Sequence, residues 1–180
     1  IIETELKSLI DLKNVKDNNS ELRALAYHLY ENNGVVKREE VLNYLNKLDQ
    51  NERKKLRNMG VKFGRYHVFL FKLFKPSSVS LRILLWKNYN EKNQDFLPPT
   101  FGLNFLEKRE KSQKDFMLLC GFENFQNFFV RIDILERLFV MIMSNQEERD
   151  NHEIKLTAEM LNLLGCNKEN FVKLIQQMNY

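Results

Sequence analysis

The apolar residues of this chain recur at helical spacing in short runs, and each run stops at a residue that breaks a helix. One run begins at the capping residue Ser20 and stops before Gly34. Another begins at the capping pair Asp49 and Glu52 and stops at Gly60, and a later one stops at Gly165. Glycine supplies the left-handed backbone on which helices commonly end. The intervening segments are short enough only for small strands, such as the alternating Val61–Phe63. The pattern therefore predicts a mainly α fold with a few short β-strands.

Two segments in the middle of the chain extend this prediction. The apolar residues between Tyr66 and Phe74 recur at three and four, which is typical of a helix, and that helix must end before Pro76. The stretch from Val79 to Trp86 is apolar nearly all round. A helix of that kind belongs at the centre of a core, so we expect it there, with the Arg82 side chain reaching an edge.

Residues 88–100 are polar and include Leu97-Pro98-Pro99, which makes them the best internal boundary. We expect a helical unit over 1–90 with a central basic segment and a second helical unit over 91–180, or one compact domain formed by both. Residues 40–43 (EVLN) resemble residues 159–162 (EMLN). This predicts two winged-helix-like units around the central apolar helix, although ordinary recurrence of short helices would give the same pattern.

The segment from Arg53 to Asn90 holds ten basic residues and no Asp or Glu, which leaves 18 (28 − 10) Lys and Arg against 24 Asp and Glu elsewhere. Aromatic residues from Phe63 to Trp86 are interleaved with the cations. Clustered cations beside aromatic rings are typical of a nucleic-acid contact. The alternative is that the rings form core and the cations coat it. The ten are Arg53, Lys54, Lys55, Arg57, Lys62, Arg65, Lys72, Lys75, Arg82 and Lys87.

The sequence contains no recognisable catalytic motif. It has no glycine-rich phosphate loop, and its histidines, His28, His67 and His152, lack zinc spacing. Cys120 and Cys166 lie far apart, and we interpret both as reduced, buried thiols. No apolar run reaches the roughly 18 residues that a membrane span needs. We therefore expect a cytoplasmic protein without a membrane partner, with no catalytic, metal or cofactor site of its own.

Five stretches carry a family resemblance: LDQ from Leu48, GVKFGRYHVFLFKLFKP from Gly60, LRILLW from Leu81, VRIDILERL from Val130, and LLGC from Leu163 followed by Phe171. They resemble the region behind the motor lobes of alphaproteobacterial superfamily-two, DExH-type helicases, which are similar to the mitochondrial degradosome RNA helicase. The resemblance covers about Ser20 to Tyr180, and the Gly60–Trp86 block is its specific part. Two positions depart from the pattern, with Phe71 in place of a proline and Arg65 in place of a small residue.

The resemblance implies that two RecA-like lobes, which bind ATP and Mg²⁺, lie N-terminal to Ile1 in a longer protein. We expect this chain to be the accessory C-terminal module of that ATP-dependent helicase, where it would hold or guide RNA or DNA. The rival hypothesis is a protein docking module that contacts the RecA-like lobes of the same chain or a nuclease partner.

The candidate nucleic-acid contacts all lie in the first part of the basic segment. We expect the cations to contact phosphates, and Tyr66 and His67 to stack on bases, although a lone histidine among aromatic residues is more often packed in a core. The candidates are Arg53, Lys54, Arg57, Lys62, Arg65, Tyr66, His67, Lys72 and Lys75.

Overall fold

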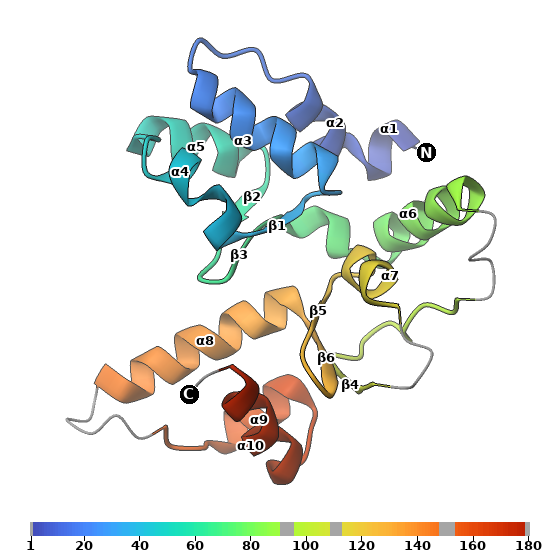
Figure 1. The fold of residues 1–180 in the computed structure, drawn as a ribbon, viewed down its shortest axis with the longest axis vertical. Helices are drawn as coiled ribbons and strands as arrows, with labels where there is room; N and C mark the ends of the chain where they lie inside the picture. The colour runs from blue at the N-terminus through green and yellow to red at the C-terminus, as the bar shows by residue number, and fades with distance from the viewer. Residues whose placement is uncertain (1, 91–95, 109–112, 148–153, 179–180) are drawn as a thin grey trace. The chain divides into compact units, whose positions relative to one another are not determined.

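The computed structural model of the chain describes residues 2–90, 96–108, 113–147 and 154–178. It is mainly α-helical with two small sheets, as predicted (Figure 1). The chain divides into two compact units, Ile1–Gln94 and Asp95–Tyr180. The boundary expected from the sequence falls after residue 90. Each unit is built around one three-stranded antiparallel sheet.

The first unit contains most of the basic segment. Its helices are α1 (Ile2–Glu5), α2 (Lys7–Lys13), α3 (Ser20–Glu31), η1 (Arg38–Val41), α4 (Leu42–Leu45), α5 (Gln50–Asn58), η2 (Phe71–Phe74) and α6 (Pro76–Tyr89). Its strands are β1 (Val35–Lys37), β2 (Val61–Phe63) and β3 (His67–Leu70). The turn into α3 is capped by Asn19, one residue before the expected Ser20, and its side chain accepts from the Leu22 amide at 2.9 Å.

The sheet of the first unit has the order β1-β3-β2, so the strand furthest along the chain lies in the middle. Val61 pairs with Leu70 and Val36 with Val68. These four side chains share one face, because side chains alternate along a strand. That face forms the unit's core with buried leucines of the helices, among them Leu25, Leu29, Leu45 and Leu56.

The predicted helix between Tyr66 and Phe74 is wrong, because the structure has β3 followed by the 3₁₀ turn η2 there. All four residues of β3 are buried, so both faces of the strand carry apolar side chains. A strand buried on both faces reads as a continuous apolar run, which periodicity cannot distinguish from a helix.

Helix α6 also differs from the expectation. Leu84, Leu85 and Tyr89 are 56%, 40% and 89% exposed, so the helix does not lie at the centre of the core. Arg82, expected at an edge, is buried instead, and its guanidinium donates to the carbonyl oxygens of Leu73 (2.7 Å) and Asn33 (3.3 Å). A helix that is apolar all round has no sequence signal for the side that is buried, and here that side is the one with the arginine.

The second unit consists of β4 (Phe105–Glu107), α7 (Lys114–Leu119), β5 (Phe122–Asn124), β6 (Phe128–Arg131), α8 (Ile132–Glu147), α9 (Ala158–Leu164) and α10 (Lys168–Gln177). Its sheet has the order β4-β6-β5. Helices α8 to α10 pack on one face of this sheet, where Phe128 and Val130 join Leu138, Met160 and Phe171 in one buried cluster. Gly165, in the left-handed conformation with φ of 72°, ends α9 where the sequence predicts.

The two sheets repeat one backbone pattern: a strand, a helix and then a hairpin whose second strand pairs with the first strand. Each hairpin residue of the second unit lies 61 positions (122 − 61) after its counterpart. The hydrogen bonds repeat as well. The Gly64 amide donates to the His67 carbonyl at 2.8 Å, and Phe125 donates to Phe128 at 2.8 Å. The similarity expected between residues 40–43 and 159–162 is a different one, because α9 comes after the second sheet instead of preceding its hairpin.

Candidate nucleic-acid interface

Helix α5 provides the first part of the candidate interface. A reciprocal capping box starts it: the Asp49 carboxylate accepts from the Glu52 amide at 2.8 Å, and the Glu52 carboxylate accepts from the Asp49 amide at 2.8 Å. Leu56 is completely buried. Lys54 and Arg57 are three residues apart and so share a face of the helix. That face points away from the core because Leu56, on a different side, is the residue that packs into the core. Lys54 and Arg57 are both exposed.

The Arg57 guanidinium lies over the Phe63 ring, with its central carbon 5.5 Å from the ring centroid. This is within the range of a cation–π contact. Phe63 is the last residue of β2, so the contact places Arg57 beside the turn that joins β2 to β3. The half-buried ring therefore has one of its faces covered by a cation from α5.

A second arginine reaches the same turn from β1. Arg38 Nη1 donates to the Gly64 carbonyl at 2.9 Å, and the Arg38 amide donates to the Tyr66 carbonyl at 2.8 Å. Arg65 lies in the turn and is exposed. We call Arg38, Arg57 and Arg65 the tip arginines. Three separate parts of the chain bring them to one turn.

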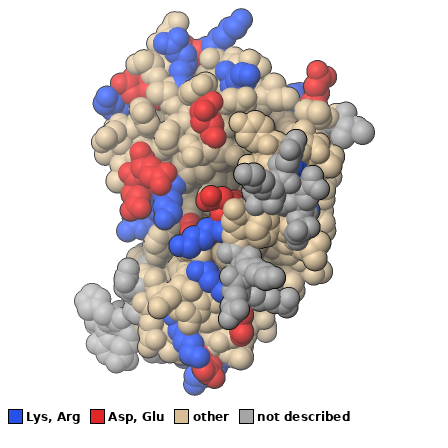
Figure 2. All heavy atoms as spheres, turned by 45° about the vertical axis from the view of Figure 1, so that its right-hand side comes forward, with Lys and Arg blue, Asp and Glu red and all other residues tan. Residues whose placement is uncertain are grey.

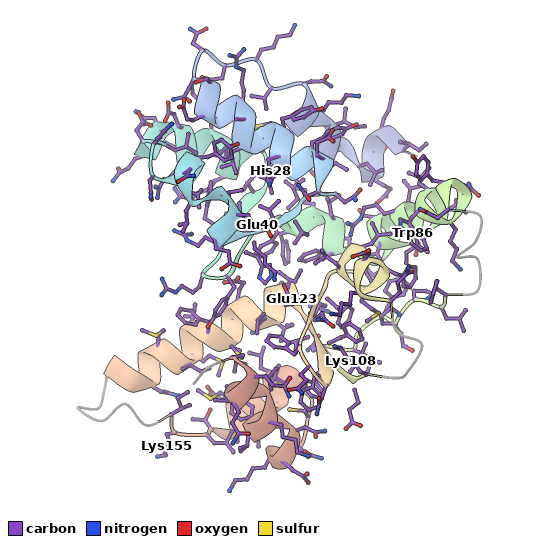
Figure 3. All side chains as sticks on the ribbon, in the orientation of Figure 1. His28, Glu40, Trp86, Lys108, Glu123 and Lys155 are labelled. Atoms are coloured by element: carbon purple, nitrogen blue, oxygen red, sulfur yellow. The ribbon has the colours of Figure 1, made fainter. Side chains whose placement is uncertain are left out.

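Arg38 is not among the candidates that the sequence suggests. It lies outside the carboxylate-free segment and is followed by Glu39 and Glu40, both exposed on η1, where Figure 3 labels Glu40. The only local signal for Arg38 in the sequence is that it follows Lys37 and the apolar pair Val35-Val36. The pairing of β1 with β3 brings this residue to the turn, and that pairing is a long-range feature.

Three of the predicted nucleic-acid contacts have side chains that are partly or wholly buried in the first unit, so they are poorly placed to bind a ligand. Arg53 is half-buried, and its Nη2 donates to the Leu45 carbonyl at 2.6 Å, which ties the end of α4 to α5. His67 is only 2% exposed, so its ring offers no surface on which a base could stack. Tyr66 lies in the turn just before β3 and is half-buried.

The predicted lysines outside α5 do not gather at the turn. Lys62 is exposed but lies on the opposite sheet face from Val61 and Phe63, because strand residues alternate. The side chain of Lys72 lies near the end of α5, with its Cδ 4.0 Å from where a Cβ on Gly60 would be. Lys75 is exposed just before α6. The structure thus brings together Lys54 and the tip arginines, and not the whole predicted set.

A carboxylate forms an ion pair with Lys55, and another carboxylate feels the charge of Lys75. Lys55 pairs with Asp17 at 2.7 Å; its hydrogen bond, aided by the Asn19 amide, lowers the pKa of Asp17, and Asp17 in turn raises the pKa of Lys55. The pKa of Glu5 is lowered mainly by a hydrogen bond from the Ser77 hydroxyl at 2.5 Å, with a smaller contribution from the charge of Lys75. On the face drawn in Figure 2, basic and acidic side chains are interspersed.

The second hairpin is a position-by-position comparison for the first. Residues 53–70 hold six Lys and Arg and no Asp or Glu, whereas their counterparts 114–131 hold two of each kind. At the matched positions, Lys54 corresponds to Asp115, Arg57 to Leu118, Lys62 to Glu123 and Arg65 to Gln126. Glu123 is labelled in Figure 3. The same backbone therefore forms without the cations.

The described ranges contain no group of three or more His, Cys, Asp or Glu side chains placed to hold a metal ion. None of the helices in those ranges combines the length and apolar character needed to cross a bilayer. Both cysteines are thiols; Cys120 is buried as predicted, whereas Cys166 is half-buried, and that partial burial raises its pKa. Comparison with protein-family models, curated proteins and solved structures found no match.

Proposed function

We propose that the first unit is a nucleic-acid-binding module in which the tip arginines and Lys54 contact phosphates. The observation that carries the proposal is the matched hairpin. Surface charge is free to vary where the fold does not need it, and the second copy of this backbone has a net charge of zero over residues 114–131. Arg53 is matched by a cation, Lys114, and Lys55 pairs with Asp17. The cations that require a reason other than folding are therefore Lys54, Arg57, Lys62 and Arg65, and a polyanion supplies one.

The element order supports a finer description of this unit. Helix α3, strand β1, helices α4 and α5 and the β2–β3 hairpin succeed one another, and the sheet order is β1-β3-β2. We interpret this as a winged-helix unit in which α5 and the hairpin lie next to each other. Arg57 over Phe63 is the contact that joins the two.

The proposed wider role is the one that the helicase resemblance implies. The module would belong to the C-terminal region of an ATP-dependent RNA or DNA helicase, and ATP and Mg²⁺ would bind the RecA-like lobes upstream. Contacts from arginine and lysine to phosphates supply affinity without sequence choice. A module that holds nucleic acid while a motor moves along it needs that kind of contact.

The test is to measure binding of the 180-residue chain to fluorescently labelled RNA and DNA, both single-stranded and duplex, at low and moderate salt. We expect binding that weakens steeply with salt. Arg65→Gln, which installs the residue of the matched position, should weaken binding by about threefold to tenfold. It should also reduce the salt slope by about 0.7 to 0.9, because it removes one cation from the phosphate backbone.

The matched control is Lys155→Gln, which removes an exposed positive charge from the second unit (Figure 3). It should leave affinity and salt slope nearly unchanged. Circular dichroism would confirm that both variants are folded. No binding to any of the four probes at low salt, or equal effects of the two substitutions, would rule out the proposal.

A second candidate function is protein docking through α6. Leu84, Leu85 and Tyr89 are exposed within about one and a half turns of this helix, which makes a contiguous apolar surface. In this proposal, the surface contacts the RecA-like lobes or a nuclease. Leu84→Glu should then abolish binding to the separately expressed lobes or to the nuclease while nucleic-acid affinity is unchanged. Retained binding of Leu84→Glu to both proteins would exclude this role for α6.

A further inference from the structure

The aromatic residues beside the tip arginines are not available as a stacking surface. Proteins that hold single strands combine a basic groove with exposed rings on which successive bases stack. Here Phe63 is half-buried with Arg57 over its ring, Tyr66 is half-buried, and His67 and Phe69 are 2% and 4% exposed. Residues 50–70, all within the described part of the chain, hold no exposed large apolar or aromatic side chain, and the exposed ring of Phe71 follows β3 at the end of the strand away from the turn between β2 and β3.

The exposed side of α5 offers charged and amide groups instead. Gln50, Asn51, Lys54, Arg57 and Asn58 are all exposed. At 100° per residue they cover the side of the helix opposite to Leu56. Groups of this kind bind phosphate oxygens and the polar edges of paired bases, and none of these contacts requires an unstacked base.

The tip arginines lie beside this helix and add a second basic position. Arg57 links the two, because it belongs to α5 and packs on the last residue of β2. Arg38 and Arg65 lie further along the same turn, Arg38 through its hydrogen bond to Gly64. The cations therefore lie on two neighbouring elements, a helix and a hairpin. A double helix presents phosphates as two rows that flank a groove, whereas a single strand presents one.

We propose that this surface binds double-helical nucleic acid in preference to single strands, with α5 and the hairpin tip contacting the two backbones on either side of one groove. The inference rests on the proposed nucleic-acid function and specifies its substrate class. The shared chemistry is a pair of phosphate backbones, which duplex DNA and duplex RNA both supply.

The experiment compares four probes of equal length: duplex DNA, duplex RNA and one single strand of each. Affinities of the 180-residue chain are measured by fluorescence anisotropy over a series of salt concentrations. We expect at least one duplex to bind about tenfold more tightly than its own single strand. Three exposed cations, Lys54, Arg57 and Arg65, predict a log–log salt slope of about −2.7 for B-form DNA, and a further contact from the half-buried Arg38 would bring it to about −3.6.

Two variants place the preference on this surface. Arg57→Leu with Arg65→Gln, both taken from the matched positions, should remove the duplex preference and reduce the duplex slope by about 1.8. Lys155→Gln should change neither. A single-strand affinity equal to or greater than that of both duplexes would overturn this inference and leave the nucleic-acid function standing. A duplex preference that survives the double substitution would also overturn it. Absence of binding to every probe would overturn both proposals.

Discussion

The hairpin of the first unit and the hairpin of the second trace the same backbone path with different surfaces. Both begin after a glycine with positive φ, 98° at Gly60 and 89° at Gly121. Both place an apolar residue at the matched core position, Val68 or Phe129, and each of these is buried. The outward positions do not match in charge. The two copies thus separate residues that the fold requires from residues that it tolerates, and the exposed cations Lys54, Arg57, Lys62 and Arg65 belong to the second group.

The two hairpins also differ in what covers the sheet. In the second unit, Phe128 and Val130 pack in a cluster formed with helices α8 to α10. The matched residues of the first unit are His67 and Phe69, and Phe69 stacks on Phe74 of η2 with 5.4 Å between the ring centroids. The same backbone pattern is thus covered by three helices in the second unit and partly by the short aromatic turn η2 in the first unit. The segment that comes after each hairpin in the chain determines its cover.

The largest expected effect tests whether the matched core positions are equivalent. Phe129→Ala should lower the free energy of unfolding by about 3–5 kcal/mol, because it removes a whole buried ring. Val68→Ala removes only two methyl groups from a fully buried site and should cost about 2 kcal/mol. Urea unfolding followed by circular dichroism measures both. If Val68→Ala lowers the free energy of unfolding as much as Phe129→Ala does, the two sites do not contribute equally to stability for each buried atom removed.

The next effect concerns the residue before the first strand of each sheet. Gly34 has a φ of 80°, and a Cβ there would lie 2.4 Å from Leu73 Cδ1, so Gly34→Ala should destabilise the chain by about 2–3 kcal/mol.

The matched residue of the second unit is Asn104, whose side chain donates to the Leu163 carbonyl at 2.9 Å. Asn104→Ala removes only that bond and should cost about 1 kcal/mol. Thermal unfolding of the two variants gives the comparison, and a tolerated Gly34→Ala would contradict the close packing against η2.

A smaller effect tests the claim that the cations are not needed for folding. Lys54→Asp, Arg57→Leu and Arg65→Gln each install the residue of the second hairpin at the matched position. Each should change the free energy of unfolding by about 0.5 kcal/mol or less, because the side chains are exposed. Urea midpoints measure this. A loss above about 2 kcal/mol for any of them would show that the fold does require that cation.

The smallest effect concerns pH and the ion pair between Lys55 and Asp17. The folded-state pKa of Asp17 is lowered, so its contribution to stability is present above the unfolded-state pKa and is lost as the pH falls through the folded value. Asp17→Asn should therefore lower stability slightly at neutral pH and leave it unchanged below the folded-state pKa, which flattens the acid side of the stability profile. The measurement is the urea midpoint as a function of pH. An identical acid slope for both proteins would contradict the depressed pKa.

Local signals predicted much of the fold. The Asp49–Glu52 capping pair, the strand at Val61–Phe63 and the stop at Gly165 all depend on residues close in sequence, and all are confirmed. The helix predicted between Tyr66 and Phe74 failed because burial on both faces of β3 removes the alternation that identifies a strand. Burial of a particular side of α6 could not be predicted, since its apolar residues surround the helix.

The candidate site was predictable only as a segment. Charge composition identified residues 53–90, but it could not tell that Arg53 turns inward to the Leu45 carbonyl or that Lys62 lies on the far face of the sheet. Arg38 became a candidate through the pairing of β1 with β3, which no neighbouring residue signals. Long-range pairing selects from a charged segment the few side chains that can act together.

The buried guanidinium of Arg82 determines how far the N-terminal half can be shortened for separate study. Because it donates to carbonyl oxygens of Asn33 and Leu73, the turn after α3 and the end of η2 are both held by a residue of α6. A truncated protein that stops after η2 would leave those carbonyl groups without the Arg82 guanidinium. Expression trials of this half should therefore extend through Tyr89, the last residue of α6.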